Sequence, residues 1–346
     1  MKVDRKEFII CLASVSPGLS PREVLEQSNS FIFSDGDVIT FNDEIMARSP
    51  CKKVGFDAAV ASSDFLKMLA KFPDKEIDIE RRKGDVVIKG TRRTAGVTCD
   101  TNLLLPFASV PAPDAWKKLR PRTWGHMLQA SRTCGQDRTQ YLTTCVHVAP
   151  QRIEGCDNYR LFRADGPTGF QQEILVPADA ITAIEGAPIE KASIGKGWIH
   201  FGSGETVFSV RCSHEKYHDD IDTMLKVSGG ELLELPDNLR DIVSRAEVMN
   251  EAGFDSRISV SIAGGILEVS SRKEGGWYKE RRKVKYRGKD LAFDVNPKFL
   301  VDILGRTREV TVGDSRMRID ADNTVFVVSL DSPGGTEDAE DGIADE

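Results

Sequence analysis

Two five-residue stretches, Thr206-Val207-Phe208-Ser209-Val210 and Thr324-Val325-Phe326-Val327-Val328, are near copies of each other and lie 118 residues apart. Both are rich in β-branched and aromatic residues, a composition that favours strands. Three helix-like segments, 64–69, 179–184 and 298–303, repeat with nearly the same period, because their anchor positions 65, 181 and 299 are separated by 116 and 118 residues. A fixed period of this length indicates an internal structural repeat.

The segments around these anchors complete the repeating unit. Three further helix-like segments, at about 5–15, 121–133 and 237–249, open each unit. Short strand-like runs follow them and are separated by glycine turns such as Asp35-Gly36 and Gly264-Gly265, the pattern of antiparallel hairpins. The expected strands are 30–33, 38–41, 86–89, 258–262 and 266–269. Each unit therefore reads helix, strands, helix, strands, which predicts an α+β fold.

Domain boundaries are expected where proline and glycine cluster, near 111–113 and 228–230. The sequence thus predicts domains at residues 1–115, 116–229 and 230–330, followed by a disordered acidic tail at 331–346. Helix ends support this division. Asn296 is a predicted N-cap with Pro297 at the first helical position, and Gly305 is expected to end that helix.

Charge and composition exclude several classes of protein. The 346 residues contain 47 Lys and Arg against 54 Asp and Glu, but the last sixteen residues hold seven acids and no base, so the body is balanced. A balanced body can still gather its positive charge on one face, so a nucleic-acid partner stays open. No apolar run is long enough for a membrane helix and no signal-peptide core is visible, which predicts a cytosolic protein without a membrane partner.

Enzymatic interpretations have little support. Seven scattered cysteines without a CxxC pair disfavour a disulfide framework or a zinc ribbon. His214 and His218 have the i, i+4 spacing of helical metal ligands but follow a strand, and Gly202-Ser203-Gly204 lies between strands rather than before a helix. We therefore expect no cofactor, no metal and no catalysis. A metal- or phosphate-dependent enzyme is kept as an alternative.

One string connects the repeat with a known family. Asp157-Asn158-Tyr159-Arg160-Leu161, followed by Ile174–Pro177, resembles the "TDGHRL … ivP" signature of bacterial replicative sliding clamps, the β subunit of DNA polymerase III. The segments 245–249 and 293–296 also resemble the family, and the order and spacing hold from residue 1 to about residue 330.

The resemblance implies a fold and a function. Family members have three two-helix, two-sheet domains per subunit, and two subunits close head to tail into a six-domain ring around duplex DNA. This chain is then expected to be a DNA polymerase processivity factor that is not an enzyme. Its partners would be double-stranded DNA, a replicative DNA polymerase, a clamp loader and a second copy of itself. The alternative within binding proteins is a clamp paralogue or mimic that docks replication proteins without being loaded.

Helices line the hole in that family, so basic residues on the predicted helices are the DNA-binding candidates. Arg22 and Gln136 join them because they lie at or near DNA-contacting loop positions of the family. Basic runs at 81–83, 92–93 and 281–285 lie on hairpins and are expected to contribute solubility on the outer wall. The expected pore residues are Arg22, Lys67, Lys71, Arg122, Arg132, Gln136, Arg240, Arg245 and Lys298.

The resemblance also implies a pocket for short hydrophobic motifs of the QLxLF type, and a dimer interface at Val110, Val248 and Met249. Four positions depart from the family: Cys156 replaces a threonine, Asn158 a glycine, Asp222 a basic residue, and Ser329-Leu330 a Met-Pro pair. A divergent partner set, as in a bacteriophage replisome, would account for these changes. The expected pocket residues are Cys156, Asn158, Tyr159, Arg160, Leu161, His218, Thr223, Val327, Val328, Ser329 and Leu330.

Overall fold

The computed structural model describes residues 2–51, 54–251 and 256–333, so the predicted tail, residues 331–346, lies outside the described residues from position 334 onward. The chain divides into two compact units. Unit 1 consists of Met1–Arg132, Gln136–Ile153 and Gly166–Tyr217, and unit 2 of Thr133–Gly135, Glu154–Asp165 and His218–Glu346. The boundaries of the three domains expected from the sequence stay a prediction.

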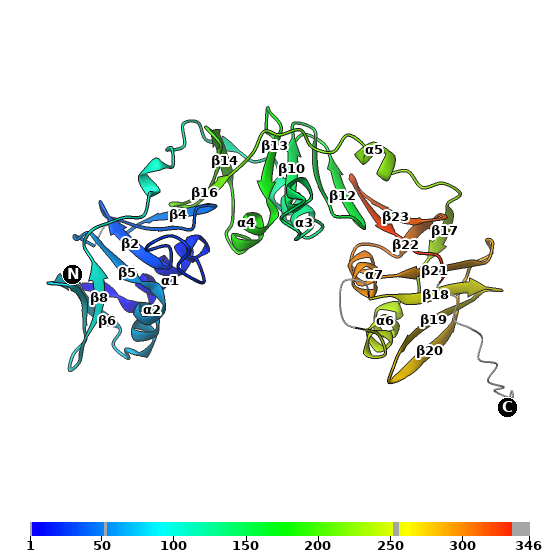
Figure 1. The fold of residues 1–346 in the computed structure, drawn as a ribbon, viewed down its shortest axis with the longest axis horizontal. Helices are drawn as coiled ribbons and strands as arrows, with labels where there is room; N and C mark the ends of the chain where they lie inside the picture. The colour runs from blue at the N-terminus through cyan, green and yellow to red at the C-terminus, as the bar shows by residue number, and fades with distance from the viewer. Residues whose placement is uncertain (1, 52–53, 252–255, 334–346) are drawn as a thin grey trace. The chain divides into compact units, whose positions relative to one another are not determined.

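Unit 1 is built on a twelve-stranded sheet with the order β1-β6-β7-β8-β5-β2-β3-β4-β16-β15-β14-β9 (Figure 1). Strands β10 and β13 of this unit pair with each other antiparallel, and β10 also neighbours β11 in a second sheet. The strands are β1 Lys2–Asp4, β2 Ser30–Ser34, β3 Asp37–Phe41, β4 Ile45–Pro50, β5 Ala58–Ala61, β6 Glu76–Arg82, β7 Asp85–Lys89, β8 Thr94–Asp100, β9 Lys117–Lys118, β10 Cys145–Ala149, β13 Ile174–Pro177, β14 Lys191–Gly195, β15 Trp198–Ser203 and β16 Thr206–Arg211. Its helices are α1 Arg5–Val15, α2 Ser62–Lys71, α3 Thr123–Ser131 and α4 Ala178–Ala183.

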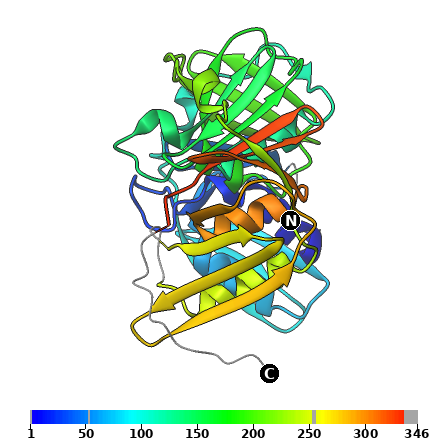
Figure 2. The ribbon, with the colours of Figure 1, turned by 90° about the vertical axis from the view of Figure 1, so that its right-hand side faces the viewer.

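Unit 2 contains a ladder in the order β12-β24-β23-β22-β17 and a four-stranded sheet in the order β20-β19-β18-β21. Figure 2 shows the four-stranded sheet in front of the helices α6 and α7. The strands are β12 Arg160–Asp165, β17 Glu231–Glu234, β18 Ile258–Ala263, β19 Ile266–Lys273, β20 Gly276–Lys283, β21 Leu291–Val295, β22 Glu309–Val312, β23 Arg316–Ala321 and β24 Thr324–Ser329. Its helices are α5 Ile221–Met224, α6 Leu239–Val248 and α7 Pro297–Leu304, and β11 (Arg152–Cys156) is divided between the two units.

Local chemistry explains where the helices begin. The Asp4 carboxylate accepts hydrogen bonds from the Lys6 and Glu7 backbone N–H groups, which caps α1. The predicted cap of α7 is confirmed, because the Asn296 side chain accepts from the Lys298 N–H, Pro297 opens the helix and Gly305 follows its end. The six helices expected from the sequence are all present, with α3 and α6 shorter than the expected segments 121–133 and 237–249. The four-residue helix α5 was not predicted, because one turn shows no helical periodicity.

The internal repeat is visible as one contact that recurs three times. Val60 on β5 pairs with Cys99, Leu175 on β13 bridges to Ser213, and Asp294 on β21 bridges to Asp331. Each contact joins the strand before the second helix of the repeat to the end of the last strand of the repeat or to the residues just after it. The near-copies Phe208 and Phe326 are equally placed, since β16 pairs with β4 and β24 pairs with β12, both antiparallel. The predicted repeat therefore corresponds to a structural one.

Alternation along the strands determines which side chains reach the core. On β6, Ile77 and Ile79 are buried while their neighbours are not. In unit 1 the rings of Phe8, Phe33 and Phe65 pack with centroids 6.2 to 6.3 Å apart, which holds α1 and α2 on the sheet. Within the described ranges, no helix has the length and apolar character that crossing a membrane requires.

Candidate functional site

Helices pack in pairs within each unit, and most of the expected DNA-binding residues lie on these pairs. Helix α1 contacts α2, α3 contacts α4, and α6 contacts α7 (Figure 1). On α2, Phe65 and Leu69 face the core, which leaves Lys67 and Lys71 exposed. Lys67 lies 3.6 Å from Asp64 one turn earlier, a contact of little energetic weight at full exposure. Helix α2 therefore presents two adjacent lysines to solvent.

The first turn of α3 carries a second basic group. Arg122 is its N-cap, with a φ of 68° that side-chain-bearing residues adopt infrequently. Burial lowers the pKa of His126 below its ordinary value, and the nearby Arg122 charge lowers it further. His126 is therefore neutral at pH 7, and Arg122 supplies the positive charge. Arg132 at the other end forms an ion pair with Glu185, which reduces its net contribution.

The third group lies on α6 and α7 in unit 2. Arg240 and Lys298 are exposed. Arg245 is also exposed, but its guanidinium binds the Glu280 carboxylate at 2.7 Å and the Tyr278 hydroxyl at 3.0 Å. Hydrogen bonds from Tyr278 and Arg245 hold the pKa of Glu280 below its ordinary value, so this ion pair is formed at neutral pH. Arg22 and Gln136 are exposed in loops of unit 1.

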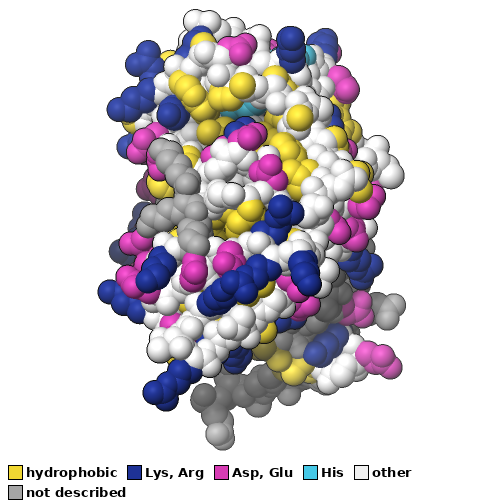
Figure 3. All heavy atoms as spheres, turned by 90° about the vertical axis from the view of Figure 1, so that its left-hand side faces the viewer, with side chains coloured by type: hydrophobic (Ala, Val, Ile, Leu, Met, Phe, Trp, Pro, Cys, Tyr) yellow, Lys and Arg dark blue, Asp and Glu magenta, His cyan; other side chains and the backbone are white. Residues whose placement is uncertain are grey.

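The basic hairpin runs have a different environment. Arg82 and Lys89 both bind the Glu80 carboxylate, and Arg281 binds Glu268 at 2.6 Å. On the side of unit 1 that carries β6 and β8, Figure 3 shows Lys and Arg side chains interspersed with Asp and Glu. Cross-strand ion pairing of this kind is consistent with the expectation that the hairpins contribute solubility.

The expected peptide pocket falls entirely within unit 2, around the junction of β12 with β24. Leu161 pairs with Val327 and Arg160 with Val328 across this junction, and the Ser329 N–H donates to the Tyr159 carbonyl at 2.7 Å. Cys156, Leu161, Val327, Val328 and Leu330 are all buried. Asn158, Tyr159, Arg160, His218, Thr223 and Ser329 are exposed or half-buried. The apolar members therefore form the base of this region, and the polar and aromatic members form its surface.

Arginine side chains stacked on aromatic rings form the surface of this junction. The Arg160 guanidinium carbon lies 4.4 Å from the Phe299 ring centroid, and that of Arg257 lies 5.6 Å from the Tyr159 ring. Arg160 also binds Asp157 at 3.0 Å and Asp302 at 3.3 Å, which fixes its plane. Sequence reasoning missed Phe299, Arg257 and Asp302, because these residues lie more than ninety residues from Tyr159 and Arg160 in the sequence.

A buried ion-pair network lies behind the same junction. Glu154 is only 1 % exposed and binds Arg163 at 2.6 Å, and Arg163 also binds Asp222 on α5 at 2.7 Å. Arg316 donates to the Thr223 and Met224 carbonyls, and Arg318 donates to the Leu225 carbonyl. Three arginines therefore hold α5. The signal available in the sequence was the charged pair Glu154 and Arg163 inside otherwise apolar strands.

The three expected dimer-interface residues have different environments. Val110 is buried in unit 1, packed in an apolar cluster with Phe41 and Trp198. Val248 is 63 % exposed at the end of α6, and Met249 packs against Gly276 at the start of β20. Lys273 donates to the Val248 carbonyl at 2.6 Å. Val248 and Met249 therefore lie beside the first residues of β20.

In the residues that the structure describes, no group of three or more His, Cys, Asp or Glu side chains is placed to hold a metal ion. His214 contacts the Glu173 carbonyl at 3.1 Å, and His218 belongs to the other unit. The candidate sites are the charged helix pairs and the junction of β12 with β24.

Solved structures show which fold this arrangement belongs to. A DNA polymerase III β-subunit sliding clamp from Pseudomonas aeruginosa, bound to griselimycin, matches with a TM-score of 0.79 at 17 % identity, over 95 % of this chain and 98 % of that one. The DNA polymerase III β chain from Streptococcus pneumoniae matches with a TM-score of 0.82 at 14 % identity and the same coverage. The β subunit from Thermotoga maritima gives 0.79 at 14 %, again with that coverage. No family model and no curated protein matches the sequence. The chain therefore has the α+β fold of the sliding clamps.

Proposed function

We propose that this chain is a DNA polymerase processivity factor: a homodimeric ring that encloses duplex DNA, slides along it and tethers a replicative polymerase. It acts in the cytoplasm, has no catalytic activity of its own and is placed on DNA by a clamp loader. The likeness in fold to sliding clamps over 95 % of the chain supports this function. The observation that carries the proposal is a pair of open strand edges.

Two of three equivalent junctions are closed within one chain, β4 with β16 and β12 with β24. By the internal repeat, β20 is the counterpart of β4 and β12, and β8 is the counterpart of β16 and β24. In the described part of the chain, β20 is the last strand of its sheet, and residues 94–98 of β8 pair with β7 alone. Two copies joined head to tail, β20 to β8, use both edges and close a ring.

Exposed apolar side chains at β20 support the same contact. Trp277 on β20 is 59 % exposed, and the exposed Val248 lies beside the start of this strand. Large aromatic residues with this exposure are typical of the centre of an interface. We assign Val248, Met249 and Trp277 to the dimer interface, with Val110 supporting it from the core of unit 1.

The mass in solution tests this assembly. We expect about twice the 38.2 kDa subunit mass by light scattering at micromolar concentration. Trp277→Glu should give monomers, because it places a charge in an apolar contact. Leu232→Glu is the matched control, since Leu232 is 69 % exposed on β17, at the edge of a different ladder. A wild-type monomer, or equal dissociation by both variants, would contradict the ring.

The function itself is tested by whether the protein encloses the DNA. After loading onto a nicked circular plasmid by the cognate loader, the ring should survive a high-salt wash that removes proteins held by phosphate contacts. A single double-strand cut should then release it. Retention that depends on salt but not on whether the DNA is circular would contradict enclosure. A dimer that binds partner peptides but is never loaded would indicate the alternative, a clamp paralogue or mimic.

Direct affinity for short duplex DNA tests the pore residues. We propose that Arg22, Lys67, Lys71, Arg122, Arg132, Gln136, Arg240, Arg245 and Lys298 face the DNA, and that the exposed members of this set contribute most. Lys71→Glu with Arg240→Glu should weaken binding and flatten its salt dependence. Lys83→Glu with Arg92→Glu, on the hairpins, changes the net charge equally and should have little effect. Equal losses would indicate diffuse attraction to the whole surface.

The junction of β12 with β24 is the proposed docking site for polymerase and loader motifs. A short Leu-Phe-type segment would pack on Tyr159 and its neighbours while Arg160 and Arg257 offer cations to its flanking residues. The departures at Cys156, Asn158, Asp222 and Ser329 change the surface that the motif meets, which fits partners that differ from those of the bacterial clamps. A bacteriophage origin is one reading of these departures.

A further inference from the structure

Exposed basic side chains form a stripe along the end of β20 and the segment that connects it to β21. All four members are exposed, whereas Val284 and Tyr286, which lie between them, are half-buried. Alternation of this kind places the charged side chains on one side of an extended backbone. The members of this basic stripe occupy every second position and are Lys283, Lys285, Arg287 and Lys289.

Hydrogen bonds hold the backbone that carries the basic stripe. The Val284 N–H donates to the carbonyl of Gly265, in the turn between β18 and β19, at 2.9 Å. The Tyr286 hydroxyl donates to the Lys289 carbonyl at 2.8 Å. The residues between the cations are therefore anchored to the sheet and to the connecting segment, and the cations are presented from a fixed backbone.

The basic stripe carries more positive charge than its neighbours neutralise. Within the described residues, none of its four cations forms an ion pair, whereas the preceding cations on the same face of β20 both bind Glu268. Glu231 lies beside Gly288, and Asp290 follows the last cation in sequence, so two carboxylates are close. Four cations against two carboxylates leave an excess of positive charge, which favours an anionic ligand.

An acidic segment of the same chain starts near this stripe. Residues 334–346, outside the described residues, contain six acids and no base, and four of these acids fall within 337–341. Asp331, just before this segment, exchanges two backbone hydrogen bonds with Asp294 on β21, at 2.9 and 3.0 Å. Arg257 binds the Asp331 carboxylate. The point from which the acidic segment departs is therefore fixed beside β21.

Strand registers give the distance from this point to the basic stripe. Lys283 pairs with Ile266 on β19, and β19, β18 and β21 follow one another across the sheet. Three strand spacings of about 4.8 Å and a shift of about four residues place Lys283 about 20 Å from Asp294. Lys289 is five residues from Asp294, which is at most about 18 Å. The thirteen residues 334–346 span at most about 43 Å, so they reach the whole stripe.

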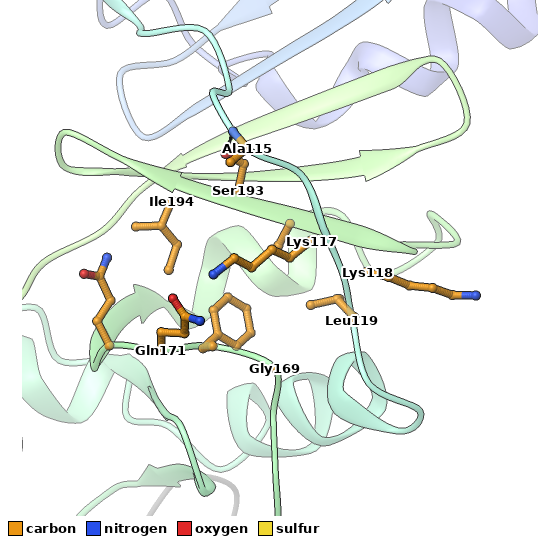
Figure 4. A pocket seen from close by; sticks show the side chains of 11 residues that line it. Ala115, Lys117, Lys118, Leu119, Gly169, Gln171, Ser193 and Ile194 are labelled. Carbon is orange, nitrogen blue, oxygen red and sulfur yellow. Dashed lines mark hydrogen bonds between the residues drawn. The ribbon is translucent and has the colours of Figure 1, made fainter.

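A second surface with lysines, in unit 1, is a weaker candidate for the acidic segment. A cleft of about 230 Å³ there is lined by eleven residues, none of them acidic, and these include Lys117 and Lys118 (Figure 4). The Lys117 amino group points into the cleft, whereas the Lys118 side chain points away from it. The cleft thus offers one cation against four on the basic stripe, and its lysines provide a control.

We propose that residues 334–346 dock on the basic stripe of the same chain and shield it from other polyanions. The acids at 337–341 pair with the four cations. Each contact is exposed and weak, but a tethered segment has an effective concentration on the order of millimolar, so a free polyanion must compete with it. This docking does not depend on the proposed clamp function.

Zero-length carbodiimide cross-linking of the full chain, read by mass spectrometry, tests the contact. The reagent joins a carboxylate to a lysine that touches it. We expect links from the acids at 337–341 to Lys283, Lys285 and Lys289 that are at least about fivefold more abundant than links to Lys117 or Lys118. Salt at about 1 M should remove them, because the Debye length falls to about 3 Å.

A mixture of isotope-labelled and unlabelled chains shows whether each link joins one chain or two. Links within one chain are expected. Links mainly between labelled and unlabelled chains would overturn the proposal in favour of the acidic segment of a second copy. Links spread over all exposed lysines, or concentrated at the cleft or on Lys298, would overturn docking on the stripe altogether.

Affinity for a single-stranded oligonucleotide tests the shielding. Fluorescein-labelled oligothymidylate is titrated with the full chain and followed by fluorescence anisotropy. Neutralising the four acids should raise its affinity by about threefold or more, because the stripe becomes available to phosphates. The four substitutions, all in the full-length chain, are Glu337→Gln, Asp338→Asn, Glu340→Gln and Asp341→Asn.

The same neutralisation in two further backgrounds separates docking from a change in net charge. With Lys285→Glu and Arg287→Glu it should give no gain, because the stripe is already disabled. With Lys117→Glu and Lys118→Glu, the control of equal charge, it should give the full gain. An equal gain in both backgrounds, or no gain in the otherwise unchanged chain, would overturn shielding of the basic stripe.

Discussion

Two connecting segments of this chain are held in place by different kinds of interaction. Connector 1, residues 101–116, follows β8 in unit 1, and connector 2, residues 218–230, precedes β17 in unit 2. Connector 1 buries Leu105 and Val110 in an apolar cluster with Phe41 and Trp198. Connector 2 also buries Ile221 and Leu225, but its polar side is held by Arg163, Arg316 and Arg318 through Asp222 and the carbonyls of α5.

The difference indicates where the molecule can change partners. Apolar packing has no direction and leaves few polar groups to recruit a ligand. Arginine contacts are directional, and they leave charged and aromatic surface half-exposed at the junction of β12 with β24. We therefore expect connector 1 to contribute stability alone and connector 2 to contribute both stability and recognition. Four measurements test this contrast.

The largest expected effect is on the buried carboxylate behind connector 2. Glu154→Ala should lower the free energy of unfolding of unit 2 by about 3–5 kcal/mol, because it leaves the Arg163 charge buried and, among the described residues, paired with the exposed Asp222. Hydrogen exchange resolved by segment would measure this loss of unfolding free energy. Glu154→Leu combined with Arg163→Met removes both charges and should cost far less. A double variant as damaged as the single one would show that packing, not charge, dominates there.

The next effect concerns connector 1. Leu105→Ala should cost about 2–4 kcal/mol of unfolding free energy in unit 1, since it opens a cavity in the apolar cluster. The same exchange measurement should show protection lost in β3 and β15 and retained in unit 2. Leu104→Ala is the neighbouring control, because Leu104 is 47 % exposed. A loss confined to unit 2 would invalidate the division of roles between the connectors.

A smaller effect is expected on the binding of a partner peptide. Arg160→Met should weaken binding of a Leu-Phe-type clamp-binding peptide by about 1–2 kcal/mol in isothermal titration, since it removes the cation over Phe299. Arg281→Met on β20 is the control. Leu161→Ala with Leu330→Ala should also weaken the peptide by at least about 1 kcal/mol. Both leucines are buried, however, so their loss must be compared with the change in stability. Unchanged affinity in Arg160→Met would place the peptide elsewhere.

The smallest expected effect is a difference between the two units in how their stability depends on pH. Burial lowers the pKa of His200, and burial with the Arg122 charge lowers the pKa of His126; both residues lie in unit 1. A histidine with a folded pKa below its unfolded value of 6.5 binds fewer protons when folded, so stability is complete above 6.5 and falls as pH decreases towards the folded pKa. Unit 1 should therefore lose exchange protection as the pH falls below about 6.5. His200→Gln should reduce this loss, and an equal loss in unit 2 would contradict the assignment to these histidines.

Local patterns in the sequence were sufficient to predict the secondary-structure elements and their repetition. The copies at Phe208 and Phe326 identified equivalent strands, and Asn296, Pro297 and Gly305 identified a helix to the residue, because caps and alternation depend on near neighbours. The charged faces of α2 and α6 were also predictable. Helix α5 was not, since one turn has no periodicity and depends on contacts from distant arginines.

Contacts between distant segments assemble these elements into sites. Sequence predicted that Leu161, Val327 and Leu330 belong to one pocket, but folding buries them and brings Phe299, Arg257 and Asp302 to its surface. Likewise, the pairing of Arg132 with Glu185 and of Arg245 with Glu280 is invisible in a charge pattern. The repeat and the type of each secondary-structure element could be predicted from the amino-acid sequence, because they follow from interactions over a few residues. Which charges are neutralised and which apolar residues are covered depends on contacts between distant segments, which exist only once the chain has packed.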